Sequence, residues 1–132
     1  MYRLHYRFAL FACVCLAALA TSAPAAVIRV KWDSPVNGPG GDWSNAYQTV
    51  AAAIAASAAG DEIWVAGDAA HPYVENITLK DGVGLYGGFA GGETTRDQRD
   101  WKTNVTILDG GGSGTAVTAP SGATATTVLD GF

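Results

Sequence analysis

The chain has 132 residues, of which 48% are hydrophobic, and it carries a formal charge of −4. This length suits one domain, and the acidic charge argues against nucleic acid as a partner because an acidic surface is repelled by the phosphate backbone. Two cysteines and two histidines are too few for a disulfide framework or a histidine-built zinc site once the N-terminal segment described next is removed. We therefore expect neither a metal nor a cofactor.

Residues 1–26 have the pattern of a signal peptide. Arg3 and Arg7 form a positive start, residues 8–20 are an uncharged apolar run, and small residues at 21–26 resemble a cleavage site. The run is short for a membrane span, which needs about 20 apolar residues, although an N-terminal anchor is the alternative. Removing both arginines changes the formal charge from −4 to −6. We expect a secreted or cell-surface protein without a transmembrane segment in its mature chain.

The first elements after the signal peptide are a strand, a loop and a helix. Residues 27–32 alternate and are rich in β-branched side chains, which predicts a strand, and the turn-forming residues at 33–42 predict a loop. Residues 47–59 place apolar side chains on one helical face, with Ser44 or Asn45 as the N-terminal cap. The face consists of Tyr47, Val50, Ala51, Ile54 and Ala58.

A short apolar run that ends in Gly or Asp-Gly then recurs along the chain. Residues 83–89, 105–111 and 126–132 align at offsets of about 22 and 21, and residues 63–67 form a weaker copy. Further short runs at 74–79 and 116–118 indicate a second strand in each repeat.

Strand-and-turn repeats of this period can stack and bury a continuous core. The absence of repeated helices excludes ankyrin and tetratricopeptide arrays, and the leucine-rich pattern is missing. We therefore predict an all-β solenoid, a right-handed parallel β-helix with an N-terminal capping α-helix, whose cap and first coils are residues 27–132. One inward ladder should contain Val65, Leu85, Ile107 and Val128.

The last repeat ends at residue 132 without a closing segment, although solenoids need capped ends. We expect the chain to be truncated at its C-terminus. The alternative is a complete small solenoid that dimerises through its open end.

Several segments are similar to a known family. Residues 41–47 and 60–66 resemble the opening of bacterial right-handed β-helix proteins of the pectate-lyase-like superfamily, and residues 85–94, 99–100 and 106–110 resemble its next coils. The resemblance implies the fold and an exported or surface location. Family members include polysaccharide lyases, tailspikes and adhesins, so the resemblance does not determine an activity. Lyases of this superfamily combine a calcium-binding carboxylate cluster with a Lys or Arg base, and no repeat strand here carries both, so we assign no catalytic residue.

The densest charge cluster interrupts the repeats at residues 91–101. Carboxylates and arginines beside an indole could hold sugar hydroxyls or uronates, or the same charges could pair with one another and fasten the loop. The candidate binding residues are Glu93, Arg96, Arg99, Asp100 and Trp101. Asp109 and Asp130 should stack in successive coils, where they could hold calcium or simply form turns.

These observations predict an exported, non-catalytic segment of a surface or adhesin-like protein that contacts a polysaccharide or cell-surface glycan. The alternative is the N-terminal part of a polysaccharide lyase or hydrolase whose active site lies beyond residue 132.

Overall fold

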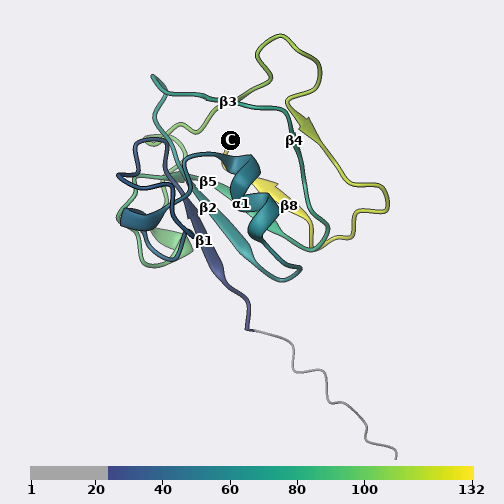
Figure 1. Cartoon of the computed structure of the whole chain (residues 1–132), viewed down its shortest axis with the longest axis horizontal. Helices are drawn as coiled ribbons and strands as arrows, with labels where there is room; N and C mark the ends of the chain where they lie inside the picture. Colours follow the sequence, from purple (N-terminus) through teal and green to yellow (C-terminus); the bar gives the residue numbers. More distant parts are fainter. Residues whose placement is uncertain (1–23) are drawn as a thin grey trace, which may run out of the picture.

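The computed structural model describes residues 24–132, so almost all of the predicted signal peptide, residues 1–23, lies outside the described residues. The described chain forms strands β1 (Val27–Val30), β2 (Glu62–Ala66), β3 (Tyr73–Val74), β4 (Ile77–Thr78), β5 (Gly84–Phe89), β6 (Leu108–Asp109), β7 (Val117–Thr118) and β8 (Val128–Asp130). Its helices are α1 (Val50–Ala56) and two 3-10 helices, η1 (Trp43–Asn45) and η2 (Arg96–Gln98). Figure 1 shows α1 beside the strands of the main sheet.

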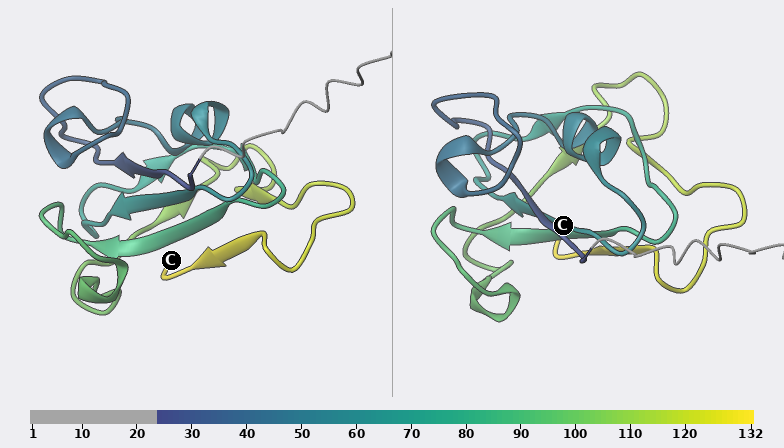
Figure 2. Two further views of the ribbon diagram at one scale, coloured as in Figure 1. Left: turned by 90° about the horizontal axis from the view of Figure 1, so that it is seen from below. Right: turned by 60° about the horizontal axis from the view of Figure 1, so that its bottom comes forward.

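All strand pairs are parallel, and they form three separate sheets. The main sheet has the order β1-β2-β5-β8, and the others contain β3 with β6 and β4 with β7. In the main sheet Ile63 lies opposite Leu85, which lies opposite Leu129. Figure 2 shows these four strands running side by side, with β8 at the opposite edge from β1.

The prediction of a right-handed parallel β-helix is wrong. Within residues 24–132 the strands are short, β3 and β6 having only two residues each, and none of the three small sheets closes or continues as a solenoid sheet. The reason lies between the later apolar runs, where turn-forming residues at 110–114 and 119–127 end β6 and β7 after two residues each.

The structure also contradicts the predicted inward ladder, which consisted of Val65, Leu85, Ile107 and Val128. Ile107 directly precedes β6, whose Leu108 pairs with Tyr73 of β3, so Ile107 does not lie beside Leu85 in the main sheet. The long polar loop at 90–107 carries the chain away from β5 before the next apolar run begins, and β8 takes the place beside β5 instead.

Asp109 and Asp130 do not stack either. Asp109 lies opposite Val74 in one sheet, whereas Asp130 lies opposite Tyr86 in another. The backbone N–H of Gly111 donates to the Asp109 carboxylate at 2.8 Å, as expected for an aspartate that forms a turn. The turn interpretation is therefore confirmed for Asp109, and the paired calcium ligands are wrong.

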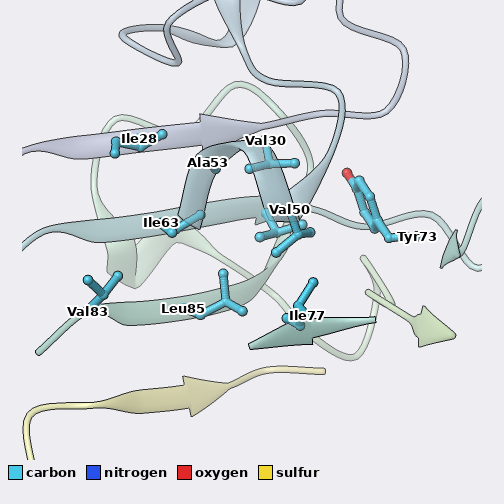
Figure 3. Packing of buried hydrophobic residues seen from close by; sticks show 10 residues of the cluster. Ile28, Val30, Val50, Ala53, Ile63, Tyr73, Ile77, Val83 and Leu85 are labelled. Atoms are coloured by element: carbon cyan, nitrogen blue, oxygen red, sulfur yellow. The ribbon is translucent and has the colours of Figure 1, made fainter. Parts of the chain in front are cut away.

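The core lies between the main sheet, α1 and the strands β3 and β4. Side chains on alternate positions of the main strands point inward, where α1 and the smaller sheets cover them (Figure 3). The labelled core consists of Ile28, Val30, Val50, Ala53, Ile63, Tyr73, Ile77, Val83 and Leu85. Burial raises the pKa of Tyr73, whose hydroxyl donates to the carbonyl of Ala66 at 2.8 Å and so joins β3 to the end of β2.

The α-helix is shorter than its sequence pattern predicts. It begins after Thr49, whose hydroxyl accepts the N–H of Ala52, and Ser44 and Asn45 lie in η1 instead. The carboxylate of Glu75 accepts the N–H groups of Val50 at 2.9 Å and Ala51 at 2.8 Å. Glu75, in the connection between β3 and β4, thus satisfies two N–H groups at the start of the helix that have no partner within the helix. Only the tertiary fold brings this carboxylate to the helix.

Asp81 fastens the long loop before β8. Its carboxylate accepts the N–H of Thr124 at 2.8 Å and the hydroxyls of Thr124 at 2.8 Å and Thr127 at 2.7 Å. These hydrogen bonds, led by the Thr124 N–H, lower the pKa of Asp81 from 3.8 to about 2.

We expect this loop to loosen in acid. Because the folded pKa of Asp81 is depressed, its contribution is present above the unfolded pKa of 3.8 and is lost as pH falls towards about 2. The protection factor of the Thr124 amide, which is the exchange rate of an unstructured amide at the same pH divided by its own, should therefore fall across this pH window. In the Asp81→Asn variant the protection factor should be low at every pH. A protection factor that does not change with pH in the unmodified chain would contradict this role for Asp81.

Candidate functional site

The predicted binding loop leaves the main sheet at a bulge in β5. The pairing register between β2 and β5 shifts there, and Gly88 has a φ of +92°, a conformation that favours glycine. The carbonyl of Gly88 accepts the N–H of Asp100 at 2.8 Å and the side-chain amide of Asn104 at 3.2 Å, while its N–H donates to the hydroxyl of Thr106 at 2.9 Å. The bulge therefore anchors both ends of the segment 100–106.

Glu93 is occupied by its own loop. Its carboxylate accepts the N–H groups of Ala90 at 2.6 Å and of Gly91 and Gly92 at 2.9 Å each. Partial burial opposes ionisation, but these N–H donors outweigh it and lower the pKa of Glu93. Its oxygens close a turn and are not directed to a ligand.

The two arginines fasten the loop to the outer face of the main sheet. Arg96 forms an ion pair with Glu62 at 2.6 Å, and its guanidinium lies 4.7 Å from the centre of the Tyr86 ring. Arg99 forms an ion pair with Asp130 and lies 5.2 Å from the same ring. Both arginines thus combine charge pairing with a cation–π contact, which favours the structural interpretation of this cluster.

Asp100 is hydrogen-bonded within its own loop, whereas Trp101 is largely open to solvent. The Asp100 carboxylate accepts the Thr103 hydroxyl at 2.9 Å and the N–H groups of Lys102 and Thr103, and the hydroxyl contributes most to lowering its pKa. The Trp101 ring is 53% exposed and lies 5.6 Å from the Arg99 guanidinium. All five predicted residues lie in one loop, and Trp101 is the one large hydrophobic side chain among them that is exposed.

A cleft of about 440 Å³ lies elsewhere, beside the carboxyl ends of the main strands, and we call it the strand-end cleft. β1, β2 and β5 are parallel, so the residues that follow Val30, Ala66 and Phe89 meet at one edge of the sheet. The polar and aromatic residues that line this cleft are Lys31, Trp32, Asp33, Asp68, Thr103 and Asn104.

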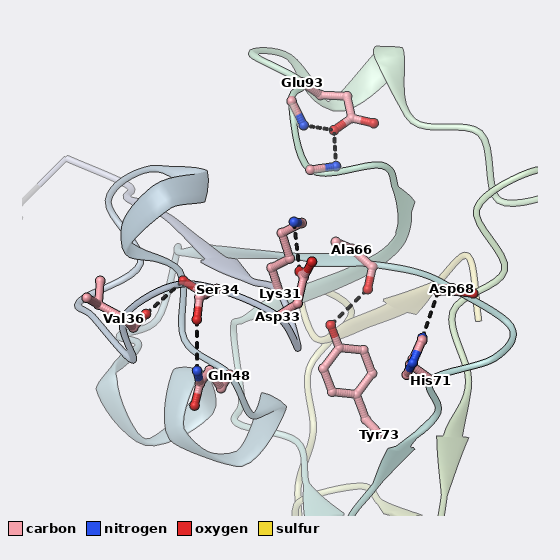
Figure 4. Close-up of polar contacts among 12 residues, drawn as sticks. Lys31, Asp33, Ser34, Val36, Gln48, Ala66, Asp68, His71, Tyr73 and Glu93 are labelled. Atoms are coloured by element: carbon pink, nitrogen blue, oxygen red, sulfur yellow. Dashed lines mark hydrogen bonds and ion pairs between the residues drawn. The ribbon is translucent and has the colours of Figure 1, made fainter.

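One ion pair and one aspartate–histidine contact lie at the strand-end cleft. Lys31 Nζ lies 2.7 Å from Asp33 Oδ1, and His71 Nδ1 lies 2.8 Å from Asp68 Oδ2. Figure 4 shows both pairs together with Ala66 at the end of β2. A hydrogen bond from the Ala70 N–H, followed by the contact with His71, lowers the pKa of Asp68. Asp68 is therefore ionised at neutral pH.

An aromatic pair adds an apolar surface to this cleft. The rings of Trp32 and His71 stack with their centres 3.7 Å apart and an angle of 13° between their planes. The stack and the Asp68 contact hold His71 from two directions, so the imidazole supports the indole. Trp32 nevertheless remains 38% exposed. An indole that is held in place and partly open to solvent is suited to contact a ligand.

Close backbone packing forms the floor of the strand-end cleft. A side chain on Gly67 would lie 2.5 Å from the carbonyl of Asn104 and 2.8 Å from the N–H of Thr106. Only glycine therefore lets the segment 103–106 approach the end of β2 and place Thr103 and Asn104 at the cleft.

The sequence prediction did not include Lys31, Trp32, Asp33 or Asp68. A signal was present, because polar residues directly follow the apolar runs at 27–30 and 62–66, and parallel pairing would gather them. The charge density at 91–101 drew attention instead, although most of those charges are satisfied by backbone N–H groups or by partners elsewhere in the chain.

Within residues 24–132 no group of three or more histidine, cysteine, aspartate and glutamate side chains is placed to hold a metal ion. The helices of this part of the chain are all too short or too polar to cross a bilayer. Comparison with protein-family models, curated proteins and solved structures finds no match to this chain.

Proposed function

We propose that this chain is a non-catalytic, glycan-contacting segment of a secreted or cell-surface protein, and that the strand-end cleft is its contact site. The observation that supports this most is the exposed Trp32 ring beside the ionised Asp68 and the Lys31–Asp33 pair. Sugars present apolar C–H faces and many hydroxyls. An indole can pack against the apolar C–H face of a sugar, and carboxylate, ammonium and amide groups can form hydrogen bonds with its hydroxyls.

The placement of these groups also supports binding. They lie on loops that follow parallel strands, so a rigid sheet holds them at one edge while their side chains remain accessible. The cleft is open and polar, which suits a hydrated polymer better than an apolar small molecule.

We expect Trp32→Ala to weaken binding to neutral and charged oligosaccharides by about tenfold or more, since losing a central aromatic contact costs over 1 kcal/mol. Isothermal titration of the full chain measures this. Trp32→Phe should recover much of the affinity because it keeps a ring. Trp101→Ala is the matched control, because Trp101 is also an exposed indole but does not line the cleft.

Three results would contradict the proposal. Loss of binding in Trp101→Ala but not in Trp32→Ala would place the site on the 91–101 loop. No binding of any oligosaccharide by the unmodified chain would exclude a glycan-contacting role. Unsaturated products from pectate, alginate or chondroitin would show a lyase, which is the alternative that the sequence left open.

A further inference from the structure

The strand-end cleft carries an uneven distribution of charge. Its one lysine, Lys31, is already paired with Asp33 at 2.7 Å, so the two charges largely cancel. Asp68 has His71 as its nearest ionisable neighbour, and its side chain is 46% exposed. The third wall, formed by Ala90, Thr103 and Asn104, contributes no charge. The negative charge of Asp68 is therefore the one that an entering ligand meets without a fixed cation beside it.

The indole of Trp32 also favours a positively charged ligand group. The face of an aromatic ring is negative, so it attracts a cation and offers nothing to a carboxylate. The described chain as a whole, the cleft included, is acidic too, with twelve Asp and Glu residues against six Lys and Arg residues once Arg3 and Arg7 are set aside. A ligand carboxylate would thus enter a field of its own sign, whereas an ammonium group would be attracted.

From this geometry we infer that the strand-end cleft prefers amino sugars, meaning glycans with a free ammonium group, over neutral sugars, and neutral sugars over uronic acids. The inference rests on the proposed glycan function of the same cleft and names its ligand class. The ammonium group would lie by the Asp68 carboxylate, and the sugar ring would lie against Trp32.

Three tetrasaccharides of different charge provide the test: glucosamine, which is cationic when protonated, N-acetylglucosamine, which is neutral, and galacturonate, which is anionic. At slightly acidic pH, where the sugar amine is protonated and Asp68 is still ionised, and at low salt, the glucosamine tetrasaccharide should bind the full chain about three- to tenfold more tightly than the N-acetylated one, as expected for a partly exposed ion pair. The galacturonate tetrasaccharide should bind most weakly. The preference should shrink as salt is added, because salt screens exposed charges.

Variants that each remove one negative charge show which carboxylate causes the preference. Asp68→Asn should lower the affinity for glucosamine much more than the affinity for the N-acetylated sugar, so that the ratio of the two affinities falls to about one. Asp33→Asn should free Lys31 and so raise the affinity for galacturonate. Asp97→Asn is the matched control, because it removes the same charge from an exposed position on η2 outside the cleft. Asp33, Asp68 and Asp97 are all exposed, so each variant should fold like the unmodified chain. Far-ultraviolet circular dichroism verifies this.

The outcomes separate the two claims. Equal affinities for the three sugars, or tightest binding of galacturonate, would overturn the amino-sugar inference and leave the glycan function standing. A preference that survives Asp68→Asn but disappears in Asp97→Asn would also overturn it. Binding of none of the three sugars would overturn the proposed function and this inference together.

Discussion

Leu85→Ala is expected to lower the free energy of unfolding by about 2–5 kcal/mol, because the removed methyl groups lose their burial and leave a cavity. Leu85 is 1% exposed and lies in the middle of the core, between β2 and β8. The side chains packed around it come from β2 and α1, whose backbones are fixed by the sheet and the helix, so these side chains can fill the cavity only in part. Urea denaturation followed by circular dichroism measures the change.

The sheet supplies a matched control for this prediction. Leu129 lies opposite Leu85 in the register of β5 and β8, but it is 41% exposed. Leu129→Ala should therefore change the free energy of unfolding by about 1 kcal/mol or less. Equal losses in the two variants would mean that the core does not lie where the structure places it.

Gly88→Ala should destabilise the chain by about 2–4 kcal/mol, because two costs add. The φ of Gly88 is +92°, which an alanine adopts poorly, and a β-carbon there would lie 2.7 Å from the Cα of Trp101. A backbone neighbour cannot move aside as a side chain could. The segment 100–106 should shift with it, so we also expect weaker glycan binding through Thr103 and Asn104.

Gly92→Ala is the control for this second prediction. Gly92 belongs to the same loop, has no positive φ, and a β-carbon there would meet no atom within 4 Å. Its free energy of unfolding should stay within about 0.5 kcal/mol of the unmodified chain. If Gly88→Ala were as stable as Gly92→Ala, the bulge would not be what anchors the loop.

The candidate site shows why charge density misleads when a sequence is interpreted alone. Glu93 and Arg96 are strongly polar, but one closes a turn and the other pairs with Glu62, 34 residues earlier in the chain. Nothing in the local sequence indicates Glu62 as the partner of Arg96. Lys31 and Asp68 are ordinary charges in two separate loops, and they line one cleft only because β1 and β2 are parallel neighbours.

The sequence by itself determined where the apolar strands lie. The runs at 62–66 and 84–89 form β2 and β5, and the run at 128–130 forms β8, because burial requires apolar side chains and turns require glycine and aspartate. It also indicated a helix near Val50, although not its length.

Only the tertiary structure decided which strands pair. The alignment of repeats placed Ile107 beside Leu85, whereas the loop at 90–107 takes the chain across to β3 and leaves that position to β8. The helix begins where Glu75 can accept its N–H groups, and the strand-end cleft exists where three strands happen to end together. Local patterns govern burial and turns, but pairing and side-chain partners depend on segments that are distant in sequence, so the register and the site follow from the whole fold.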